Sequence, residues 1–400
     1  MIKGIDVPYY SSKFCDKVHP SMPKKILFFY SFIMTVMPVY STRHNKSILR
    51  PDGECVYVYN WSNYLPKSVI DQFTKETGIK VVYDTFESPD ALETKMVAGA
   101  AYDIVFPPLF PSFSRLLRSS CFRPLMQKWI PNMRRVTSPI VQKIPPKMIQ
   151  YGVPYAWGTT GIGINRTQIS AAHESLPMDS WGMLFDENNL KKLSDTNVSF
   201  LEGMDLIQCI LIYLGHDPTS TDQKIWKKGL QYFEQIRPLM KKFDTLHQFT
   251  NMINAHTVVM NGYSTYINMA KHKARTLDDG PDIDYVIPKE GAMIWIDMMA
   301  VPKNSRHPKN AHIFINFILQ PRIMGEISNT IRAANAVPDS MPFMNQDMIQ
   351  DPSIVPPDAV YDRLFLDAPY PASLVRYVTR LFMQIKSGHP VQWDDPWHDQ

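Results

Sequence analysis

The stretch that decides the fold is residues 56–86, VYVYNWSNYLPKSVIDQFTKETGIKVVYDTF. Its apolar start, 56–59, predicts a short β-strand that ends in the polar and aromatic turn 60–64. Pro66 then begins a helical pattern with apolar residues on one face, and Gly78 ends it. The stretch therefore predicts a strand, a turn rich in functional groups, and a helix.

The same alternation continues beyond this helix. A second apolar run at 79–83 predicts a strand, and Ser88 followed by Pro89 is a typical helix start. A third strand is expected at 102–106. The β-α-β-α-β order favours an α/β fold with a mostly parallel sheet covered by helices. Ligands of such sheets bind beyond the carboxyl ends of the strands, which is where the turn 60–64 lies.

Length and charge limit the class of protein. A chain of 400 residues predicts two domains or two interleaved lobes, and 44% hydrophobic with 20% charged residues predicts a packed protein. The first fifty residues hold eight Lys or Arg and two Asp or Glu, which leaves 34 basic and 36 acidic residues in the rest. The remainder therefore has no basic excess, and we expect no nucleic-acid partner.

The basic excess at the front indicates a targeting segment. Residues 22–25 include two lysines, 26–37 are apolar, and 39–41 include small residues of the kind that precede a cleavage site. The apolar run is shorter than the ~20 residues that span a bilayer. We interpret 1–41 as an upstream extension followed by a signal peptide at 22–41, so the mature protein is expected in the periplasm.

Sequence motifs for catalysis or metal binding are missing. The chain has no Gly-x-Ser-x-Gly, no phosphate-binding Gly-x-x-x-x-Gly-Lys, no His-Glu-x-x-His and no Cys-x-x-Cys. We therefore expect a protein that is not an enzyme and needs no cofactor or metal. Beyond the signal peptide three cysteines remain, an odd number, so we expect at least one buried free thiol among Cys55, Cys121 and Cys209.

The rest of the chain alternates further strands and helices. Residues 151–165 read as a long strand crossing from one lobe to another, and two loops are expected at 131–146 and 338–357. Further strands are expected at 198–201, 258–260, 282–287 and 292–301, and helices at 113–117, 206–214, 225–240, 311–319, 323–328 and 373–386.

Aromatic and acidic residues occur at or near the predicted strand ends. They are Trp61, Tyr64, Glu202, Asp205, Tyr263, Tyr266, Trp295 and Asp297. Aromatic faces attract cations and pack against methylene chains, and a carboxylate accepts charge-assisted hydrogen bonds from an ammonium group. This combination predicts an aliphatic amine as ligand. Each aromatic could equally be a core residue, and the two acids near 202–205 could serve the helix dipole instead.

Several motifs give the sequence a family resemblance. YNWSNY at 59–64, FTKETGIKVVYD at 73–84, PYAWGTTGIGIN at 154–165, VSFL at 198–201 and IPKEGAM at 287–293 resemble the spermidine/putrescine-binding proteins of bacterial ABC importers, with most similarity to the putrescine-binding branch. The resemblance implies a monomeric, two-lobed periplasmic binding protein of type II topology that passes a polyamine to a membrane permease. It also implies discontinuous lobes, 54–157 with 285–334 and 158–284 with 335–390, and a ligand cleft between them.

The resemblance also assigns roles to individual residues. Asp297 matches the carboxylate that binds an amine, Glu202 and Asp205 fall beside the ligand, and ligand contacts are implied for Trp61, Ser62, Tyr263 and Trp295. Other positions depart from the family: Asn63 and Tyr266 stand where aspartates are expected, Pro108 replaces a serine, and Ala333 beside Arg332 replaces a tyrosine. Thr196 and Val258 stand at the family's disulfide positions, so no disulfide is expected there.

Two alternatives stay open, and the departures motivate the first of them. One is an altered ligand: a monoamine, a longer polyamine, or an amino acid-like zwitterion whose carboxylate meets Arg332. The other is a receptor of the same fold that reports to a signalling partner.

Overall fold

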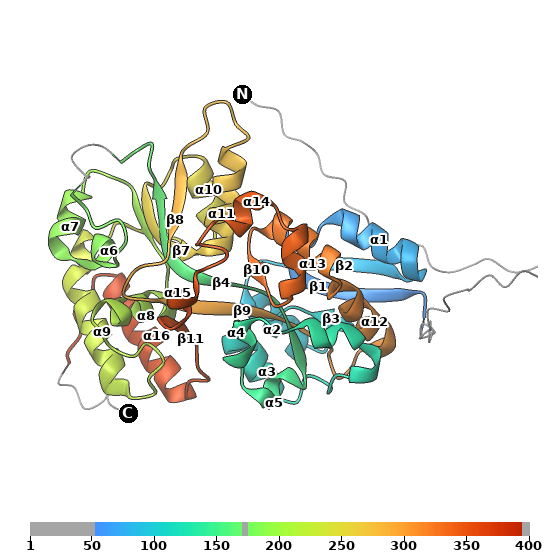
Figure 1. Ribbon diagram of the computed structural model, residues 1–400. Helices are drawn as coiled ribbons and strands as arrows, with labels where there is room; N and C mark the ends of the chain where they lie inside the picture. Colours follow the sequence, from blue (N-terminus) through green and yellow to red (C-terminus); the bar gives the residue numbers. More distant parts are fainter. Residues whose placement is uncertain (1–52, 170–174, 394–400) are drawn as a thin grey trace, which may run out of the picture. The chain divides into compact units, whose positions relative to one another are not determined.

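The computed structural model describes residues 53–169 and 175–393, and its strands form one mixed sheet (Figure 1). The predicted signal peptide and upstream extension lie outside the described residues. Within the described ranges no helix has both the length and the apolar character of a membrane span.

The described strands are close to those expected from the sequence. They are β1 (Cys55–Trp61), β2 (Lys80–Phe86), β3 (Ile104–Val105), β4 (Gly152–Asn165), β5 (Val198–Phe200), β6 (Lys242–Phe243), β7 (Val259–Tyr263), β8 (Ile283–Val286), β9 (Ala292–Ala300), β10 (Ala334–Asn335) and β11 (Leu364–Leu366).

The described helices surround these strands. They are α1 (Lys67–Thr77), α2 (Pro89–Val97), α3 (Ser114–Arg118), α4 (Pro139–Gln142), α5 (Pro146–Ile149), α6 (Gly182–Phe185), α7 (Glu187–Lys192), α8 (Met204–Tyr213), α9 (Gln223–Ile236), α10 (Gln248–Ile253), α11 (Ser264–Ala274), α12 (Pro308–Ile318), α13 (Pro321–Ile331), α14 (Gln346–Ile349), α15 (Asp358–Tyr361) and α16 (Ala372–Lys386).

The sheet is mixed rather than mostly parallel. Its strand order is β2-β1-β3-β9-β4-β7-β5-β6, and β1 pairs in parallel with both β2 and β3, as the β-α-β-α-β pattern predicts. The antiparallel pairs come from two long central strands, because β4 runs antiparallel to β9, β7 and β8. The first half of β4 pairs with β9 and the second half with β7 and β8, so this strand connects two groups of elements (Figure 1).

Local chemistry explains the first helices. Gly78 ends α1 in the left-handed conformation at φ 76°, a geometry that glycine adopts without strain. Ser88 caps α2 by accepting a hydrogen bond from the Ala91 amide, and Pro89 occupies the first turn.

Other boundaries differ from the prediction. Trp61 belongs to β1 rather than to the following turn, the strand expected at 102–106 is only β3, and β7 extends to Tyr263. The two segments expected as loops contain short helices, namely η3 (Pro131–Arg135) and α4 in the first and η6 (Pro338–Phe343) with α14 in the second. Both segments are rich in proline, which starts short helical turns but prevents long helices.

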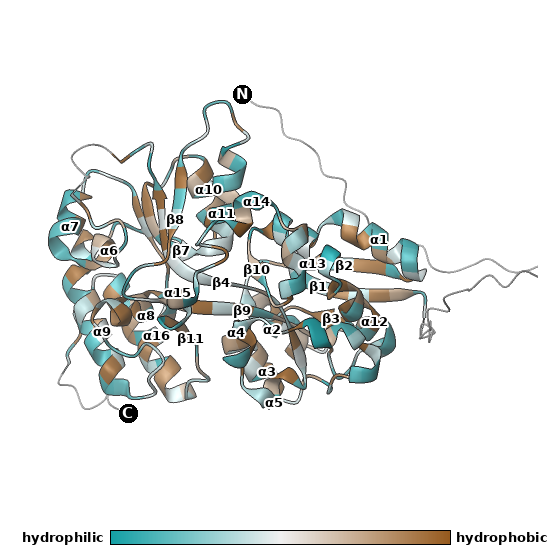
Figure 2. Cartoon of the chain, in the orientation of Figure 1, coloured by the Kyte–Doolittle hydropathy of each residue, from teal (hydrophilic) through white to brown (hydrophobic). Residues whose placement is uncertain are grey.

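Buried side chains form three large clusters. One group takes residues from 162–293 and from α16, including Trp181, Trp226 and Phe233. Two further clusters take their residues mainly from 56–157 and 292–337. Figure 2 shows apolar strands flanked by helices whose outer surfaces are largely hydrophilic. The fold is therefore the expected two-lobed α/β fold, while the exact lobe boundaries stay a prediction.

Candidate functional site

A cavity of about 510 Å³ lies where several strands end. Trp61 is the last residue of β1, Glu87 follows β2, Tyr263 ends β7 and Asp367 follows β11. The first turns of α8 and α11 add Asp205 and Tyr266, and β9 crosses the floor with Trp295 and Asp297. The cavity therefore lies at the strand ends, the position that α/β sheets commonly use for ligands.

Asp297 is the most enclosed acid of the cavity. It is 4% exposed, and its Oδ1 accepts a hydrogen bond from Trp61 Nε1 at 3.2 Å. The Tyr64 hydroxyl is a second hydrogen-bonding partner of this carboxyl group. Burial raises the pKa of Asp297 to about 7, and the two hydrogen bonds offset only part of that rise. Ionised Asp297 is therefore a costly group that a cation would stabilise.

The cavity has a second acidic group, which is the pair Asp205 and Asp367. Asp205 Oδ2 accepts a hydrogen bond from the Tyr263 hydroxyl at 2.6 Å, and Asp367 Oδ1 accepts one from Gln208 Nε2 at 2.8 Å. Burial and, to a smaller extent, the nearby charge of Asp367 raise the pKa of Asp205 to about 6, although the Tyr263 hydrogen bond lowers it. The pKa of Asp367 is also raised by burial. Two carboxylates in one enclosure repel each other, so this pair also favours a bound cation.

Aromatic rings lie between and beside these acids. The centroids of Trp61 and Tyr64 are 6.4 Å apart, and so are those of Tyr263 and Tyr266. Tyr263 bonds Asp205, while Tyr266 lies close enough to Asp297 for that charge to raise the pKa of its hydroxyl, in addition to the effect of burial. The two tyrosines thus connect the acidic pair with Asp297, and their rings can cover a hydrocarbon chain that runs between the acids.

Gly158 fixes the position of Trp295. A Cβ atom at Gly158 would lie 2.3 Å from the Trp295 ring and 2.3 Å from Ser264 Oγ, so only glycine fits there. Trp295 Nε1 also donates a hydrogen bond to the carbonyl of Thr159 at 3.2 Å. The ring is therefore held against β4 at the edge of the cavity.

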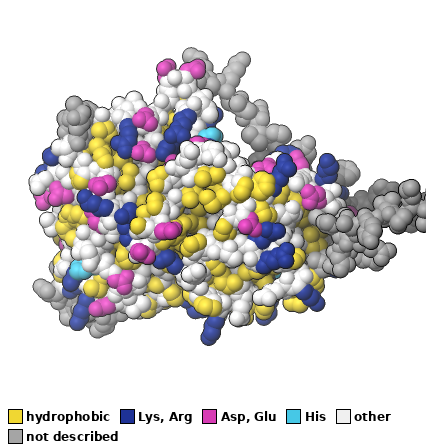
Figure 3. Space-filling view, viewed as in Figure 1, with side chains coloured by type: hydrophobic (Ala, Val, Ile, Leu, Met, Phe, Trp, Pro, Cys, Tyr) yellow, Lys and Arg dark blue, Asp and Glu magenta, His cyan; other side chains and the backbone are white. Residues whose placement is uncertain are grey.

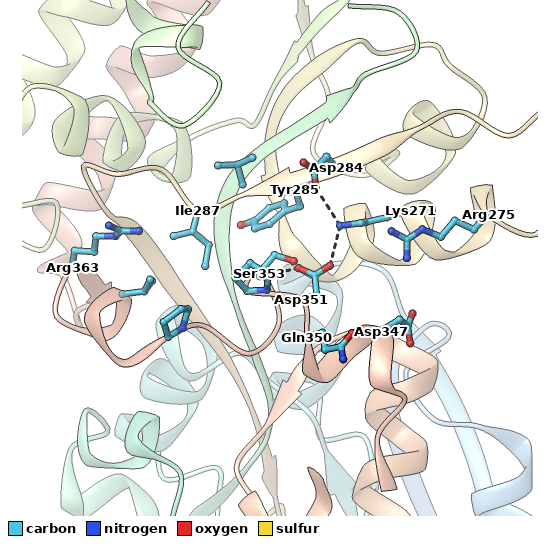
Figure 4. Close-up of a pocket in the computed structure, with 14 residues that line it drawn as sticks. Lys271, Arg275, Asp284, Tyr285, Ile287, Asp347, Gln350, Asp351, Ser353 and Arg363 are labelled. Carbon is cyan, nitrogen blue, oxygen red and sulfur yellow. Dashed lines mark hydrogen bonds and ion pairs between the residues drawn. The ribbon is translucent and has the colours of Figure 1, made fainter. Parts of the chain in front are cut away.

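The charge of the lining distinguishes this cavity from another one. Its described lining holds four carboxylates, Glu87, Asp205, Asp297 and Asp367, and no Lys or Arg. A second cavity, of about 670 Å³, is lined by α11, β8 and part of 347–363 (Figure 4). There Lys271 Nζ lies 3.2 Å from Asp284 and 2.9 Å from Asp351, and the lining holds three basic and three acidic residues. Of these two cavities, the first has an unbalanced negative charge that would attract an amine.

Three predicted site residues do not line this cavity. The Ser62 hydroxyl donates a hydrogen bond to Glu87, and Asn63 is exposed with a φ of 59°. Glu202 does not line the cavity and pairs with Lys386 at 2.6 Å, so its place beside the ligand stays a prediction. The residues predicted for the site that do line the cavity are Trp61, Tyr64, Asp205, Tyr263, Tyr266, Trp295 and Asp297.

Two acids of the cavity were missed by the sequence analysis. Glu87 comes directly after β2, and Trp61 is the last residue of the neighbouring strand β1. Its position at a strand end could therefore have identified Glu87 as a candidate site residue. Asp367 follows a three-residue strand that pairs with β9, and no sequence pattern indicated that strand. Its inclusion in the site depends on a contact between segments about seventy residues apart.

Of the positions that depart from the family pattern, some line the cavity and others are buried away from it. Pro108 lines the cavity, and Ala333 is a core residue that is 2% exposed. Arg332 is also 2% exposed, lies 3.0 Å from Asp347 and contacts His272. It does not line the cavity and is not placed to meet a ligand carboxylate.

The described residues include three cysteines, none of which forms a disulfide. Cys55, Cys121 and Cys209 are free, and Cys209 is buried, which confirms the expected buried thiol. Within residues 53–169 and 175–393 no group of His, Cys, Asp and Glu is arranged to hold a metal ion.

Comparison with known proteins identifies the family. Residues 106–352 match the model of the bacterial extracellular solute-binding proteins. The chain belongs to this family. It is 34% identical to the putrescine-binding periplasmic protein SpuD of Pseudomonas aeruginosa, over 84% of this chain and 93% of SpuD. It is 32% identical to the putrescine-binding periplasmic protein PotF of Escherichia coli, over 85% of this chain and 93% of PotF.

Solved structures agree with this fold. A putative spermidine/putrescine ABC transporter protein from Listeria monocytogenes has a TM-score of 0.72 at 24% identity, covering 84% of this chain and all of that one. The potD protein of Streptococcus pneumoniae, a spermidine/putrescine ABC transporter substrate-binding protein, also has a TM-score of 0.72, at 23% identity. The predicted two-lobed binding-protein fold is thereby confirmed.

Proposed function

We propose that this solute-binding protein captures a polyamine of the putrescine and spermidine class in its acidic cavity and delivers it to an ABC permease. The observation that carries the proposal is the pairing of two separate acidic groups, Asp297 and the Asp205–Asp367 pair, in one cavity without a lining Lys or Arg. A diamine carries one ammonium group for each acidic group, and its methylene chain can pack on the intervening rings.

The relatives support this ligand class. SpuD and PotF are putrescine-binding periplasmic proteins, and their similarity extends over most of the present chain. We infer that this protein likewise works in the periplasm as a monomeric, non-enzymatic binding protein. Closure of its lobes over the amine would present the loaded form to the permease.

The amino acid-like alternative is not favoured. A zwitterion would need a cation in the cavity for its carboxylate, and Arg332 is instead paired with Asp347. A ligand carboxylate would also face four acids of the lining. A sensing role in place of transport is likewise not favoured by the relatives, and adjacency of the gene to permease and ATPase genes distinguishes the two roles.

Calorimetric titration of the purified protein tests the proposal. Putrescine, cadaverine, spermidine and agmatine carry two or more positive groups, whereas 4-aminobutyrate carries one positive and one negative group. We expect at least one of the first four to bind with a Kd of roughly 1 μM or below, and 4-aminobutyrate at least about 100-fold more weakly. Binding of 4-aminobutyrate equal to that of every diamine would refute the proposal.

A further inference from the structure

Two segments of the chain carry an excess of positive charge. Residues 104–169 contain nine Lys or Arg and no Asp or Glu, and residues 298–325 contain four Lys or Arg and no Asp or Glu. Beyond the first fifty residues the chain as a whole has 34 basic and 36 acidic residues. Both segments are therefore locally basic, and the acidic excess lies in the rest of the chain.

The fold brings these two segments together. The Lys303 amide donates a hydrogen bond to the Cys121 carbonyl at 2.7 Å, and the Arg123 guanidinium donates one to the Lys303 carbonyl at 2.9 Å. Further along, the Asn132 amide donates to Asn316 Oδ1 of α12 at 2.9 Å. Figure 3 shows dark blue side chains along the lower edge of the molecule, in the part where Figure 1 has α3 and α5.

Two of the cations in these segments share one aromatic ring. Lys128 Nζ lies 5.5 Å and Lys309 Nζ 6.0 Å from the centroid of the Trp129 ring, which is only partly buried. The neighbouring Met126 is 42% exposed, and its amide donates a hydrogen bond to His312 Nε2 at 2.9 Å. A partly exposed tryptophan with lysines and an exposed apolar side chain beside it is a combination typical of membrane interfaces.

We define the basic surface by the cations that these contacts and the adjoining turns contribute. They are Arg123, Lys128, Arg134, Lys303, Arg306 and Lys309. Four of them, at 128, 134, 303 and 306, are exposed and have no acidic partner among the described residues. Arg115 and Arg135 belong to the same segments but pair with Glu93 at 3.3 Å and Asp339 at 2.5 Å, so they are left out.

The arrangement of these cations favours a broad anionic partner. None of the six lines either of the cavities described above, and they come from two segments rather than from one loop. An enclosed anion would need converging side chains, whereas a layer of phosphate groups needs cations spread over a surface. The exposed methionine and tryptophan add apolar contacts that a lipid layer can accept and a soluble anion cannot.

We propose that the basic surface binds an anionic phospholipid membrane. The lipid phosphates pair with the lysines and arginines, and Met126 with the exposed part of Trp129 contacts the layer just below the headgroups. Such contact holds the protein at the membrane that carries the permease. The inference goes beyond the proposed function, because it does not depend on which amine occupies the acidic cavity.

Vesicle flotation of the purified full chain tests the inference. The probes are vesicles of phosphatidylcholine with about 30% phosphatidylglycerol and vesicles of phosphatidylcholine alone, both at about 0.1 M salt. We expect at least about tenfold tighter binding to the anionic vesicles, and loss of that difference at about 1 M salt. Equal binding to both kinds of vesicle would overturn the inference. Binding to soluble polyglutamate but not to anionic vesicles would also overturn it, in favour of an acidic protein as partner.

Two matched triple variants locate the contact. Lys128→Gln, Lys303→Gln, Arg306→Gln should weaken binding to anionic vesicles at least about tenfold. The control Lys75→Gln, Lys224→Gln, Lys273→Gln loses the same charge from α1, α9 and α11 and should stay within about threefold of wild type. An equal loss in both triple variants would overturn the inference, because net charge alone would then explain the binding.

Two features keep this comparison clean. All the chains compared carry the same N-terminal segment, so any lipid affinity of the predicted signal peptide cancels between them. None of the substituted residues lines the acidic cavity, so both triple variants should bind the amine as wild type does. A failure of vesicle binding therefore leaves the proposed function intact, and a failure of amine binding leaves this inference intact.

Discussion

Acidification should weaken ligand binding by an amount that follows from the raised pKa values of two carboxyl groups in the cavity. The pKa of Asp297 is raised to about 7 and that of Asp205 to about 6 in the unliganded cavity. An ammonium ligand binds the ionised forms, so each carboxyl group must lose its proton before it can pair. Affinity is therefore full above both pKa values and falls as the pH drops through them.

The magnitude follows from the two raised pKa values. Between pH 7.5 and pH 5.5, protonation of Asp297 alone lowers the affinity about 25-fold, and protonation of Asp205 lowers it about fourfold more. The combined loss is about 100-fold, provided that the bound ligand holds both pKa values below 5. At pH 6.5 binding should release about one proton per ligand.

Calorimetry in buffers of different ionisation enthalpy measures both quantities at once. The variant Asp297→Asn is the matched control, because it removes the larger contribution and should leave a pH dependence of only about fourfold. An affinity that stays constant between pH 7.5 and 5.5, with no proton released, would refute the view that these carboxyl groups are protonated in the empty cavity.

Three further predictions test the site and its support. Asp297→Asn should stabilise the unliganded protein at pH 7.5 by about 4 kcal/mol, measured by urea unfolding. The reason is that the folded-state pKa of Asp297 is raised to about 7, so its ionisation lowers the free energy of unfolding as the pH rises through that value. An unchanged free energy of unfolding would contradict the cost assigned to this acid. Gly158→Ala should destabilise the fold by about 1–3 kcal/mol, because a Cβ would lie 2.3 Å from the Trp295 ring. The displaced ring should also weaken ligand binding. Unchanged ligand affinity would show that the position of Trp295 is not needed for binding. Glu202→Gln should leave the ligand affinity within about twofold of wild type, because Glu202 pairs with Lys386 outside the cavity. A large loss of affinity would instead support the ligand contact that the sequence predicted for Glu202.

The sequence predicted the elements whose signals are local. The cap at Ser88, the stop at Gly78 and the apolar runs of β1 and β2 depend on neighbouring residues, and the structure has these elements within a few positions. The parallel pairing of β1 with β2 and β3 follows from the same alternation. The antiparallel pairing of β4 with β9 could not be read in this way, because it joins segments more than 130 residues apart.

The site was predictable only in part for the same reason. Trp61, Asp297 and Tyr263 stand at strand positions that periodicity reveals, so they could be singled out. Glu202 and Asp205 are three residues apart at a helix start, and sequence alone could not decide which one faces the cavity. The structure turns Asp205 toward Tyr263 and Glu202 toward Lys386. Asp367 depends on the pairing of β11 with β9, which no local pattern indicated.

The central claim is that each of two acidic groups binds one end of a diamine. The direct measurement is the affinity of putrescine and of n-butylamine, a matched ligand with a single ammonium, for wild type and for the double variant Asp205→Asn, Asp367→Asn. Asp351→Asn serves as control, because its carboxylate pairs with Lys271 outside this cavity. We predict that wild type binds putrescine at least about 100-fold more tightly than n-butylamine, and that the double variant binds the two equally. A double variant that keeps the full preference for putrescine would contradict the claim.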